Sequence, residues 1–312
     1  MIARHSRTLN PIKHLDATSP LLDDAYLERL VEAYATGARL ARDGGFDFVD
    51  IKQCHTYLLN ELLAARQRDG PYGGAFENRT RLVRDVVTAI KRECGEGLML
   101  ASRVNVYDGP RYHAAAGERG EPDPEPDNTG WGTSEADGIS PDLSEPLRLV
   151  GMLRDLGVRL INVTMGSPYF NSHIGRPFER APIDGYDSPE HPLAGVERHF
   201  RLAGEVQRAY PDVTVIGTGY SWLRHYAAFA GEANVRDGRI SIMGLGRGAL
   251  AYPDFAADLS ERGKMDDRKS CIGVSYCTAL MRAKNNDLGQ FPAGCVPRDP
   301  LYAEEFKQAT GR

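Results

Sequence analysis

Cysteine and tryptophan are scarce in this sequence, and it contains no long hydrophobic run. The 312 residues include 5 Cys and 2 Trp. An odd number of cysteines in a chain this long fits a reducing compartment better than a disulfide framework. No apolar stretch reaches the roughly 20 residues that a membrane-spanning helix needs, and the N-terminal stretch MIARHSRTLNPIKHLD lacks the apolar centre of a secretory signal. We therefore expect a cytoplasmic protein with no membrane partner.

A strong excess of charge of either sign is also missing. The net charge is -5 and the pI is ≈ 5.9, so electrostatics offer no reason to expect a nucleic acid as a partner. Charged residues make up 26% and hydrophobic residues 41% of the chain, as in soluble globular proteins. The length suits one large α/β domain or two ordinary domains. A small-molecule substrate is the partner that these properties leave open.

Short strands alternate with amphipathic helices along the chain. Apolar runs rich in β-branched and aromatic residues predict five strands, at 46–51, 98–106, 159–164, 213–216 and 240–243. Apolar residues at helical spacing predict helices at 23–44, 82–90, 147–156, 193–210, 221–233 and 254–262. This alternation predicts an α/β fold with a parallel sheet or barrel, in which the first strand is buried on both faces.

Two long segments interrupt the pattern. Residues 108–140 are rich in glycine, proline and acidic residues, and only Tyr112 and Trp131 could anchor them. We expect this segment to be a mobile, solvated loop, with an ordered lid as the alternative. Residues 165–192 form a second long loop that is rich in Gly, Pro, Tyr and His.

Polar side chains follow the first predicted strand at once. Lys52, His55 and Tyr57 lie within six positions at its carboxyl end, the place where α/β barrels and sheets carry their reactive groups. A phenol holds its proton at neutral pH and can deliver it to a carbanion, and an imidazole can donate a hydrogen bond to a carbonyl oxygen. The sequence therefore predicts a catalytic site here.

The same stretch resembles a known family. The Lys52, His55, Tyr57 motif is followed by Tyr72-Gly73-Gly74 and by Glu77-Asn78-Arg79. This combination is similar to the old yellow enzyme family of NADH:flavin oxidoreductases, especially the branch of dienoyl-CoA reductases. The resemblance implies a (β/α)8 TIM-barrel fold, an FMN cofactor and NADH or NADPH as hydride donor.

The five predicted strands correspond to strands four to eight of that barrel. The resemblance covers about 21–295, and the family's first third has no counterpart in this sequence. We therefore expect a partial barrel at 1–265, followed by a cysteine-containing tail at 266–312. A partial barrel exposes apolar strand edges, which favours pairing with another chain, a second copy of this one included.

The resemblance also implies roles for the motif residues. Tyr57 would be the proton donor, and His55 would polarise the substrate carbonyl. Lys52 stands where the family usually has histidine, and it would still donate a hydrogen bond to an enolate oxygen. Alternatively, Lys52 is structural and pairs with a carboxylate such as Asp50 or Glu61.

Further along the chain, an arginine and two glycine-rich turns complete the predicted cofactor site. Arg103 interrupts an apolar strand, where it would contact the N1 and O2 edge of the flavin, or else form a buried ion pair with Asp50 or Glu61. Turns after strands seven and eight of a barrel commonly bind phosphate through backbone N–H groups. The predicted phosphate-binding residues are Gly217, Gly219, Gly246 and Arg247.

Three cysteines follow the last barrel helix: Cys271, Cys277 and Cys295. Dienoyl-CoA reductase relatives have four cysteines there that bind a [4Fe–4S] cluster, but Val274 occupies the second position in this sequence. Because a cluster takes four soft ligands, we expect free cysteines and no metal site.

The predicted activity is FMN-dependent reduction of the activated C=C bond of an α,β-unsaturated carbonyl compound, with Tyr57 as proton donor. Two alternatives remain open. Lys52 could form a Schiff base in a barrel lyase, or the chain could be a non-catalytic partial barrel that does not bind flavin.

Overall fold

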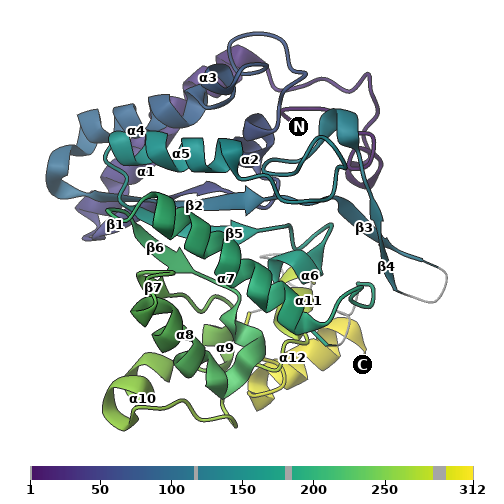
Figure 1. The fold of residues 1–312 in the computed structure, drawn as a ribbon, viewed down its shortest axis with the longest axis vertical. Helices are drawn as coiled ribbons and strands as arrows, with labels where there is room; N and C mark the ends of the chain where they lie inside the picture. Colours follow the sequence, from purple (N-terminus) through teal and green to yellow (C-terminus); the bar gives the residue numbers. More distant parts are fainter. Residues whose placement is uncertain (1, 116–118, 180–184, 284–292, 312) are drawn as a thin grey trace.

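The sheet of this protein is the predicted one. The computed structural model describes residues 2–115, 119–179, 185–283 and 293–311. Five strands pair in the order β1-β2-β5-β6-β7, and all four pairings are parallel. These strands are β1 (Phe48–Gln53), β2 (Met99–Tyr107), β5 (Leu160–Met165), β6 (Thr214–Gly217) and β7 (Ile242–Met243). The predicted α/β class and all five strand positions are therefore confirmed (Figure 1).

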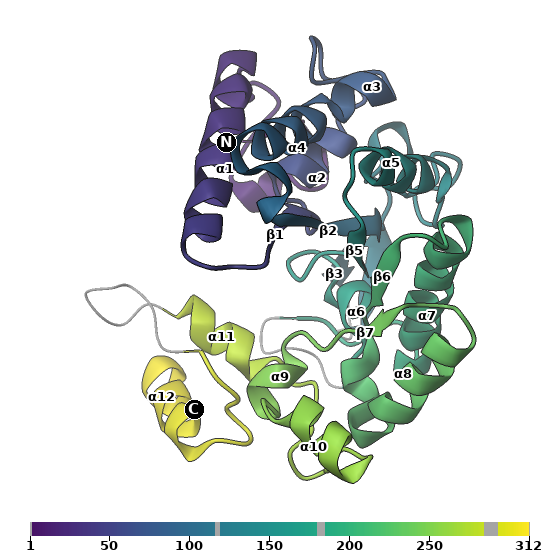
Figure 2. The same cartoon turned by 90° about the vertical axis from the view of Figure 1, so that its left-hand side faces the viewer.

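Helices cover the convex face of this curved sheet. They are α1 (Asp24–Asp43), α2 (Leu58–Leu63), α4 (Arg81–Cys94), α5 (Ser144–Asp155), α7 (Pro192–Ala209) and α8 (Ala227–Arg236). Figure 2 shows them outside the arc of strands, whereas α11 (Tyr276–Arg282) and α12 (Pro300–Thr310) lie on the concave side. The arrangement is a partial (β/α)8 barrel with helices outside and the strand ends directed at one rim.

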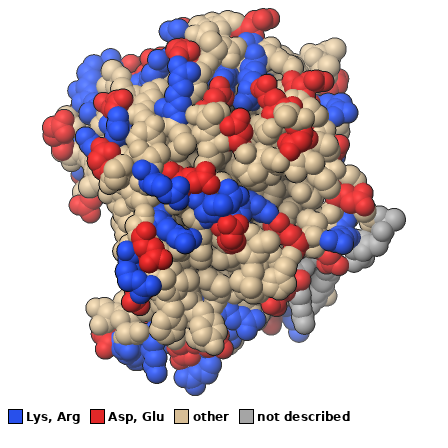
Figure 3. Space-filling view, viewed as in Figure 1, with Lys and Arg blue, Asp and Glu red and all other residues tan. Residues whose placement is uncertain are grey.

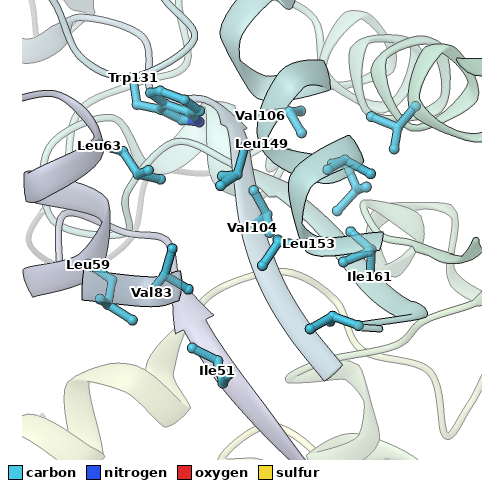
Figure 4. Close-up of a cluster of buried hydrophobic side chains, with 14 of the residues drawn as sticks. Ile51, Leu59, Leu63, Val83, Val104, Val106, Trp131, Leu149, Leu153 and Ile161 are labelled. Carbon is cyan, nitrogen blue, oxygen red and sulfur yellow. The ribbon is translucent and has the colours of Figure 1, made fainter. Parts of the chain in front are cut away.

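The main core lies between the sheet and these helices. In Figure 4, Val83 of α4, Val104 of β2 and Leu149 of α5 point into one cluster. Helix α4 buries one face because its apolar residues recur every three or four positions. The chain enters α1 through an N-cap, since the Asp23 carboxylate accepts a hydrogen bond from the Tyr26 N–H at 2.6 Å.

Strand β1 differs from the prediction of a strand buried on both faces. Ile51 is 3% exposed, but Phe46 and Phe48 are 67% and 45% exposed. The reason is that β1 is the edge strand of the sheet, and only its helix-facing side is covered in the described parts of the chain. The alternating pattern of a half-buried strand therefore applies to β1.

The expected mobile loop at 108–140 is largely an ordered structure, so this prediction was wrong. It contains the antiparallel strands β3 (Arg111–Ala114) and β4 (Gly120–Asp123) and the turn η3 (Pro126–Asn128). The Trp131 ring is fully buried and stacks on Phe76 with centroids 6.4 Å apart. Burial of an aromatic anchor outweighs the polar composition of the segment.

Shorter elements connect these parts. They are η1 (Pro11–Lys13), α3 (Phe76–Arg79), η2 (Gly95–Gly97), α6 (Ser172–Gly175), η4 (Tyr220–Tyr226), α9 (Gly248–Ala251) and α10 (Phe255–Arg262). The helix predicted at 221–233 is divided into η4 and α8, because Arg224 has a left-handed backbone with φ 52. The C-terminal helices have a small cluster of their own, formed by Leu280, Val296 and Phe306.

Acidic and basic side chains lie side by side over the face shown in Figure 3, in keeping with the small net charge. Among the described helices, none combines the length and the apolar character needed to cross a membrane.

Candidate active site

A cavity of about 640 Å³ lies at the carboxyl ends of the strands. It is lined from the turn after β1 by His55, from β2 by Arg103, from β5 by Asn162 and Thr164, and from the loops after β6 and β7 by Gly219 and Gly246. The volume is within the range of small-molecule and cofactor sites. Residues predicted from distant parts of the sequence therefore meet at one rim of the partial barrel.

Three polar side chains lie at one level of the sheet. Lys52 of β1 is in register with Arg103 of β2, and Arg103 is in register with Asn162 of β5. Because side chains alternate along a strand, residues in register point to the same face, here the concave one. Sequence reasoning had found the first two but not Asn162, although it is a polar residue inside the apolar run LINVTM.

Arg103 and Asn162 each have a buried polar atom with no hydrogen-bond partner among the residues that the structure describes. These atoms are Arg103 Nε and Asn162 Oδ1, and both residues line the cavity. Among the described residues, Arg103 forms no ion pair with Asp50 or Glu61, and the Glu61 carboxylate is paired with Lys13. A buried donor and a buried acceptor without partners cost free energy, so they indicate a polar ligand at this place.

The backbone turns sharply at His55. His55 and the following Thr56 both have left-handed backbones, with φ 60 and φ 56. This conformation is costly for residues other than glycine, and such strain concentrates at functional sites. The Thr56 N–H donates to Asn60 Oδ1 at 2.6 Å, which holds the turn. Burial, together with the charges of Arg103 and Lys52, lowers the pKa of His55 to about 3, so its imidazole is neutral at pH 7.

Tyr57 lies at the N-cap of α2 and contacts two side chains. Its phenol oxygen is 3.0 Å from that of Tyr169, a residue of the β5–α6 loop that lines the cavity. The Lys52 ammonium is 3.2 Å from the centroid of the Tyr57 ring, a cation–π contact. Among the described residues, Lys52 forms no ion pair with either carboxylate proposed for it. The hydrogen bond with Tyr169, then burial, raises the pKa of Tyr57, so it stays protonated at neutral pH.

The glycines of the two glycine-rich turns differ in the space around their Cα atoms. A Cβ on Gly219 would lie 2.6 Å from the His199 ring, and one on Gly217 would lie 2.7 Å from Ile240. Packing therefore requires glycine at both positions, and Gly217 does not line the cavity. A Cβ on Gly246 would meet nothing within 4 Å, so this glycine borders open space.

The turn after β7 offers backbone and side-chain hydrogen-bond donors to a ligand. Within the described chain, the backbone N–H groups of Gly246 and Arg247 donate no hydrogen bond. The Arg247 guanidinium donates to Thr278 Oγ1 at 2.5 Å and to Ser275 Oγ at 3.3 Å. Burial, with the nearby charge of Arg176, lowers the pKa of Arg247 to about 10. An anion placed here would be stabilised by all these groups.

Comparisons with known proteins agree with this geometry. Residues 11–118 match the model of the NADH:flavin oxidoreductase / NADH oxidase family. An NADPH dehydrogenase of Halalkalibacterium halodurans is 28% identical over 185 residues, 58% of this chain and 43% of the relative. A probable N-methylproline demethylase of Rhizobium meliloti is 25% identical over 259 residues, 82% of this chain and 32% of the relative.

The chain is thus similar to the NADH:flavin oxidoreductase / NADH oxidase family over residues 11–118. It spans less than half the length of these two curated relatives. Among solved structures, the 6-hydroxypseudooxynicotine amine oxidase of Pseudomonas geniculata N1 matches with a TM-score of 0.63 and 21% identity over 94% of this chain and 36% of that one. An old yellow enzyme homologue of Zymomonas mobilis matches with a TM-score of 0.51 and 18% identity over 80% and 56%. These structural matches confirm the barrel-type fold.

The residues of this site fit a flavin. The unpartnered Arg103 Nε and Asn162 Oδ1 suit the polar edge of a flavin ring, which presents acceptors and a donor. The open turn at Gly246 and Arg247 suits a phosphate. Both ends line the same cavity, so one mononucleotide could contact them together.

The cysteines do not form a metal site in the described structure. Cys271, Cys277 and Cys295 are free thiols that line a small separate cavity, together with Arg176 and Arg247. Among the described residues, no group of three or more His, Cys, Asp or Glu side chains could hold a metal ion. Burial raises the pKa of the Cys295 thiol.

Sequence reasoning missed several residues of the cavity wall. Besides Asn162, these are Tyr169 and Arg176 from the long loop at 165–192 and Thr278 and Arg282 from α11. Their positions depend on how loops fold over the strand ends, and hydrophobic periodicity carries no information on that. The concentration of Tyr and Arg in otherwise irregular segments was the one available signal.

Proposed function

We propose that this chain is an FMN-dependent NAD(P)H oxidoreductase that reduces the activated C=C bond of an α,β-unsaturated carbonyl compound. The proposal is carried by one observation: a cavity at the strand ends has unpartnered polar atoms of Arg103 and Asn162 at one place and free N–H groups with Arg247 at another. The match of residues 11–118 to a flavin oxidoreductase family supports a flavin as the ligand for this pair of contacts.

The residues that would hold the cofactor follow from their chemistry. Gly246 and Arg247 would bind the phosphate, because backbone N–H groups and a guanidinium both complement an anion. Arg103 would contact the N1 and O2 edge of the ring, where its positive charge stabilises the anionic reduced form. Asn162 offers an acceptor to a ring N–H. A single short glycine turn suits a mononucleotide better than the longer motif that binds a dinucleotide.

The side chains around the cavity would complete the reduction. Bound flavin supplies a hydride to the β-carbon of the substrate. Tyr57 would transfer its phenolic proton to the neighbouring α-carbon, and its phenolate would regain a proton from solvent. Tyr169 holds the Tyr57 hydroxyl in place and, as a hydrogen-bond donor, would stabilise the phenolate that forms.

His55 would bind the substrate carbonyl oxygen. With a pKa lowered to about 3, its imidazole is neutral and donates one N–H without competing for the proton of Tyr57. A hydrogen bond to the carbonyl oxygen draws electron density from the alkene, so the β-carbon accepts hydride more readily. Lys52, held over the Tyr57 ring, would keep positive charge near the developing enolate.

Two other functions compete with this one. A Schiff-base lyase would need a free Lys52 amine, but the ammonium lies over the Tyr57 ring, 3.2 Å from its centroid. A non-catalytic barrel would not bind FMN. Borohydride trapping of a carbonyl compound on Lys52 would support the lyase.

The deciding experiment is a titration of the purified chain with FMN in which flavin fluorescence and absorbance report binding. We expect saturable binding, NAD(P)H-dependent bleaching, and reoxidation by an enone such as trans-cinnamaldehyde. The variant Arg247→Met should raise the Kd for FMN by about 10- to 100-fold, as expected for loss of a charged hydrogen bond.

The matched control is Arg201→Met, since Arg201 is exposed on α7 and pairs there with Glu197 and Glu205. This variant should bind FMN like the parent chain. Absence of FMN binding to a chain with intact circular dichroism would contradict the proposal.

A further inference from the structure

We propose that a side chamber beside the active-site cavity binds an anionic group of the substrate. The substrate class is then an α,β-unsaturated carbonyl compound that also carries a carboxylate. This inference rests on the function proposed above and adds to it a determinant of substrate choice.

The chamber adjoins the cavity and shares a wall with it. It has a volume of about 290 Å³ and lies between β3, the loop after β5 and helix α11. Tyr169, Arg176, Arg247 and Arg282 line both spaces. A ligand whose reacting bond lies in the cavity could therefore extend into the chamber without crossing a separate layer of protein.

Among the described residues, the arginines of the shared wall have no carboxylate partner, whereas Arg111, which lines only the chamber, is paired with Asp123 at 3.5 Å. Among the described lining residues of both spaces there is no Asp or Glu. Arg176 donates to Ser275 Oγ at 3.4 Å and Cys271 Sγ at 2.7 Å. Within the described parts of the chain, neither Arg176 nor Arg282 forms an ion pair. Several guanidinium groups lining a concave space create a positive potential that attracts an anion.

The proposed cofactor does not use all of these arginines. Arg103 and Arg247 serve the ring and the phosphate of the flavin, which leaves Arg176 and Arg282 at the chamber. The Arg282 guanidinium carbon is 4.8 Å from the centroid of the Tyr169 ring. The Tyr169 hydroxyl is in turn 3.0 Å from that of Tyr57. A cation therefore lies one residue away from the proposed proton donor.

The chamber also has an aromatic wall, which favours an organic anion over an inorganic one. Tyr112 and Tyr186 are stacked with centroids 5.9 Å apart, and Phe170 and Phe178 line the same space. Aromatic rings offer apolar area to a carbon skeleton, while a guanidinium pairs with a carboxylate through two parallel hydrogen bonds. A planar carboxylate suits this combination of walls.

Direct binding tests the chamber without turnover. The chain, with and without FMN, would be titrated calorimetrically with cinnamate, cinnamamide and phenyl phosphate. We expect cinnamate to bind at least about tenfold more tightly than cinnamamide, and the difference to shrink as salt is raised. Equal affinity of cinnamate and cinnamamide would overturn the proposal. Tighter binding of phenyl phosphate than of cinnamate would overturn the assignment of a carboxylate.

Kinetics of matched substrates test the link to catalysis. The ratio of kcat/KM for 4-carboxycinnamaldehyde to that for trans-cinnamaldehyde should be at least about 10 in the parent chain. Arg282→Met should lower this ratio about tenfold, and Arg282→Lys should restore most of it. The control Arg201→Met should leave the ratio unchanged. A ratio near 1 in the parent chain, or one unaffected by Arg282→Met, would overturn the proposal.

These outcomes separate the two proposals. The chain could bind flavin and reduce trans-cinnamaldehyde without any preference for anions. That result would leave the proposed function intact and would contradict a role of the chamber in substrate binding. Arg282-dependent binding of cinnamate by a chain that does not bind FMN would contradict the proposed function while the anion site stands.

Discussion

Tyr57 shows how a few contacts can determine what a single side chain does. Its hydroxyl is bonded to Tyr169, its ring lies under Lys52, and its backbone begins helix α2. The first contact raises the pKa and keeps the proton on the pair at neutral pH. The second keeps a cation close, which would stabilise a transient phenolate after proton transfer.

Replacing Tyr57 by Phe tests this role. We expect Tyr57→Phe to lower kcat for enone reduction by about 10²- to 10⁴-fold, the usual effect of removing a general acid. The Kd for FMN should stay the same, because the groups proposed to hold FMN belong to other residues, Arg103 and Arg247 among them. Tyr169→Phe is the matched control and should cost less, since the proton donor remains. Equal kcat values for Tyr57→Phe and the parent chain would exclude Tyr57 as the proton donor.

Glycines at the two turns should respond differently to the same substitution. Gly219 has φ +92 and its Cβ would clash with His199, so Gly219→Ala should lower the free energy of unfolding by about 1–3 kcal/mol. Gly246→Ala meets open space and should change stability by less than about 0.5 kcal/mol, but it should weaken FMN binding. Urea unfolding and FMN titration of both variants measure the contrast. Equal stability losses would contradict it.

At the scale of elements, β1 links the core to the site. Its helix-facing residues are buried against α1 and α2, while its concave residues lead toward the cavity. An edge strand of this kind needs one buried face to set its register, because a shift by one residue would exchange the two faces. Register in turn places Lys52 beside Arg103, so the packing of β1 and the geometry of the site depend on each other.

The two faces of β1 should differ in what they contribute to stability. Ile51→Ala should lower the free energy of unfolding by about 2–4 kcal/mol, as in other buried positions. Phe48→Ala should cost less than about 1 kcal/mol, because Phe48 is 45% exposed. Urea unfolding monitored by circular dichroism provides both values. A cost for Phe48→Ala as large as that for Ile51→Ala would show that the concave face is covered in solution.

At the scale of the whole molecule, buried histidines make folding sensitive to acid. Burial lowers the pKa of His55 and of His173 to about 3, and that of His199 to about 4. His199 Nε2 is 3.0 Å from the Ile174 carbonyl oxygen, and this contact raises the pKa of His199 but does not outweigh the effect of burial. In the unfolded chain each imidazole has a pKa near 6.5.

Stability should therefore fall as the pH drops below about 6.5 and continue to fall toward pH 4. In this window the unfolded chain binds protons that the folded chain does not, so protonation favours unfolding. Thermal unfolding at pH 8, 6.5, 5.5 and 4.5 should show a declining Tm. His199→Gln cannot gain that proton and should decline less steeply. A Tm that is constant from pH 6.5 to 4.5 in the parent chain would contradict this prediction.

The sequence by itself determined the elements and the rim where chemistry gathers. Strand and helix positions follow from the spacing of apolar residues, and that spacing reflects which face is buried. Lys52 and His55 could be assigned to the carboxyl end of a strand because they follow an apolar run, and Arg103 was evident because it interrupts one. The Tyr-Gly-Gly and Glu-Asn-Arg motifs indicate a resemblance to the family whose model matches residues 11–118.

Only the tertiary structure decided how loops complete the site. The fold brings Tyr169 onto Tyr57 and places Arg282 of α11 beside Tyr169, across more than 100 residues in each case. It also buried Trp131 within a segment whose composition indicated a mobile loop. Periodicity reports burial along one element, whereas these contacts depend on the packing of several elements that are distant in sequence, and no local pattern encodes them.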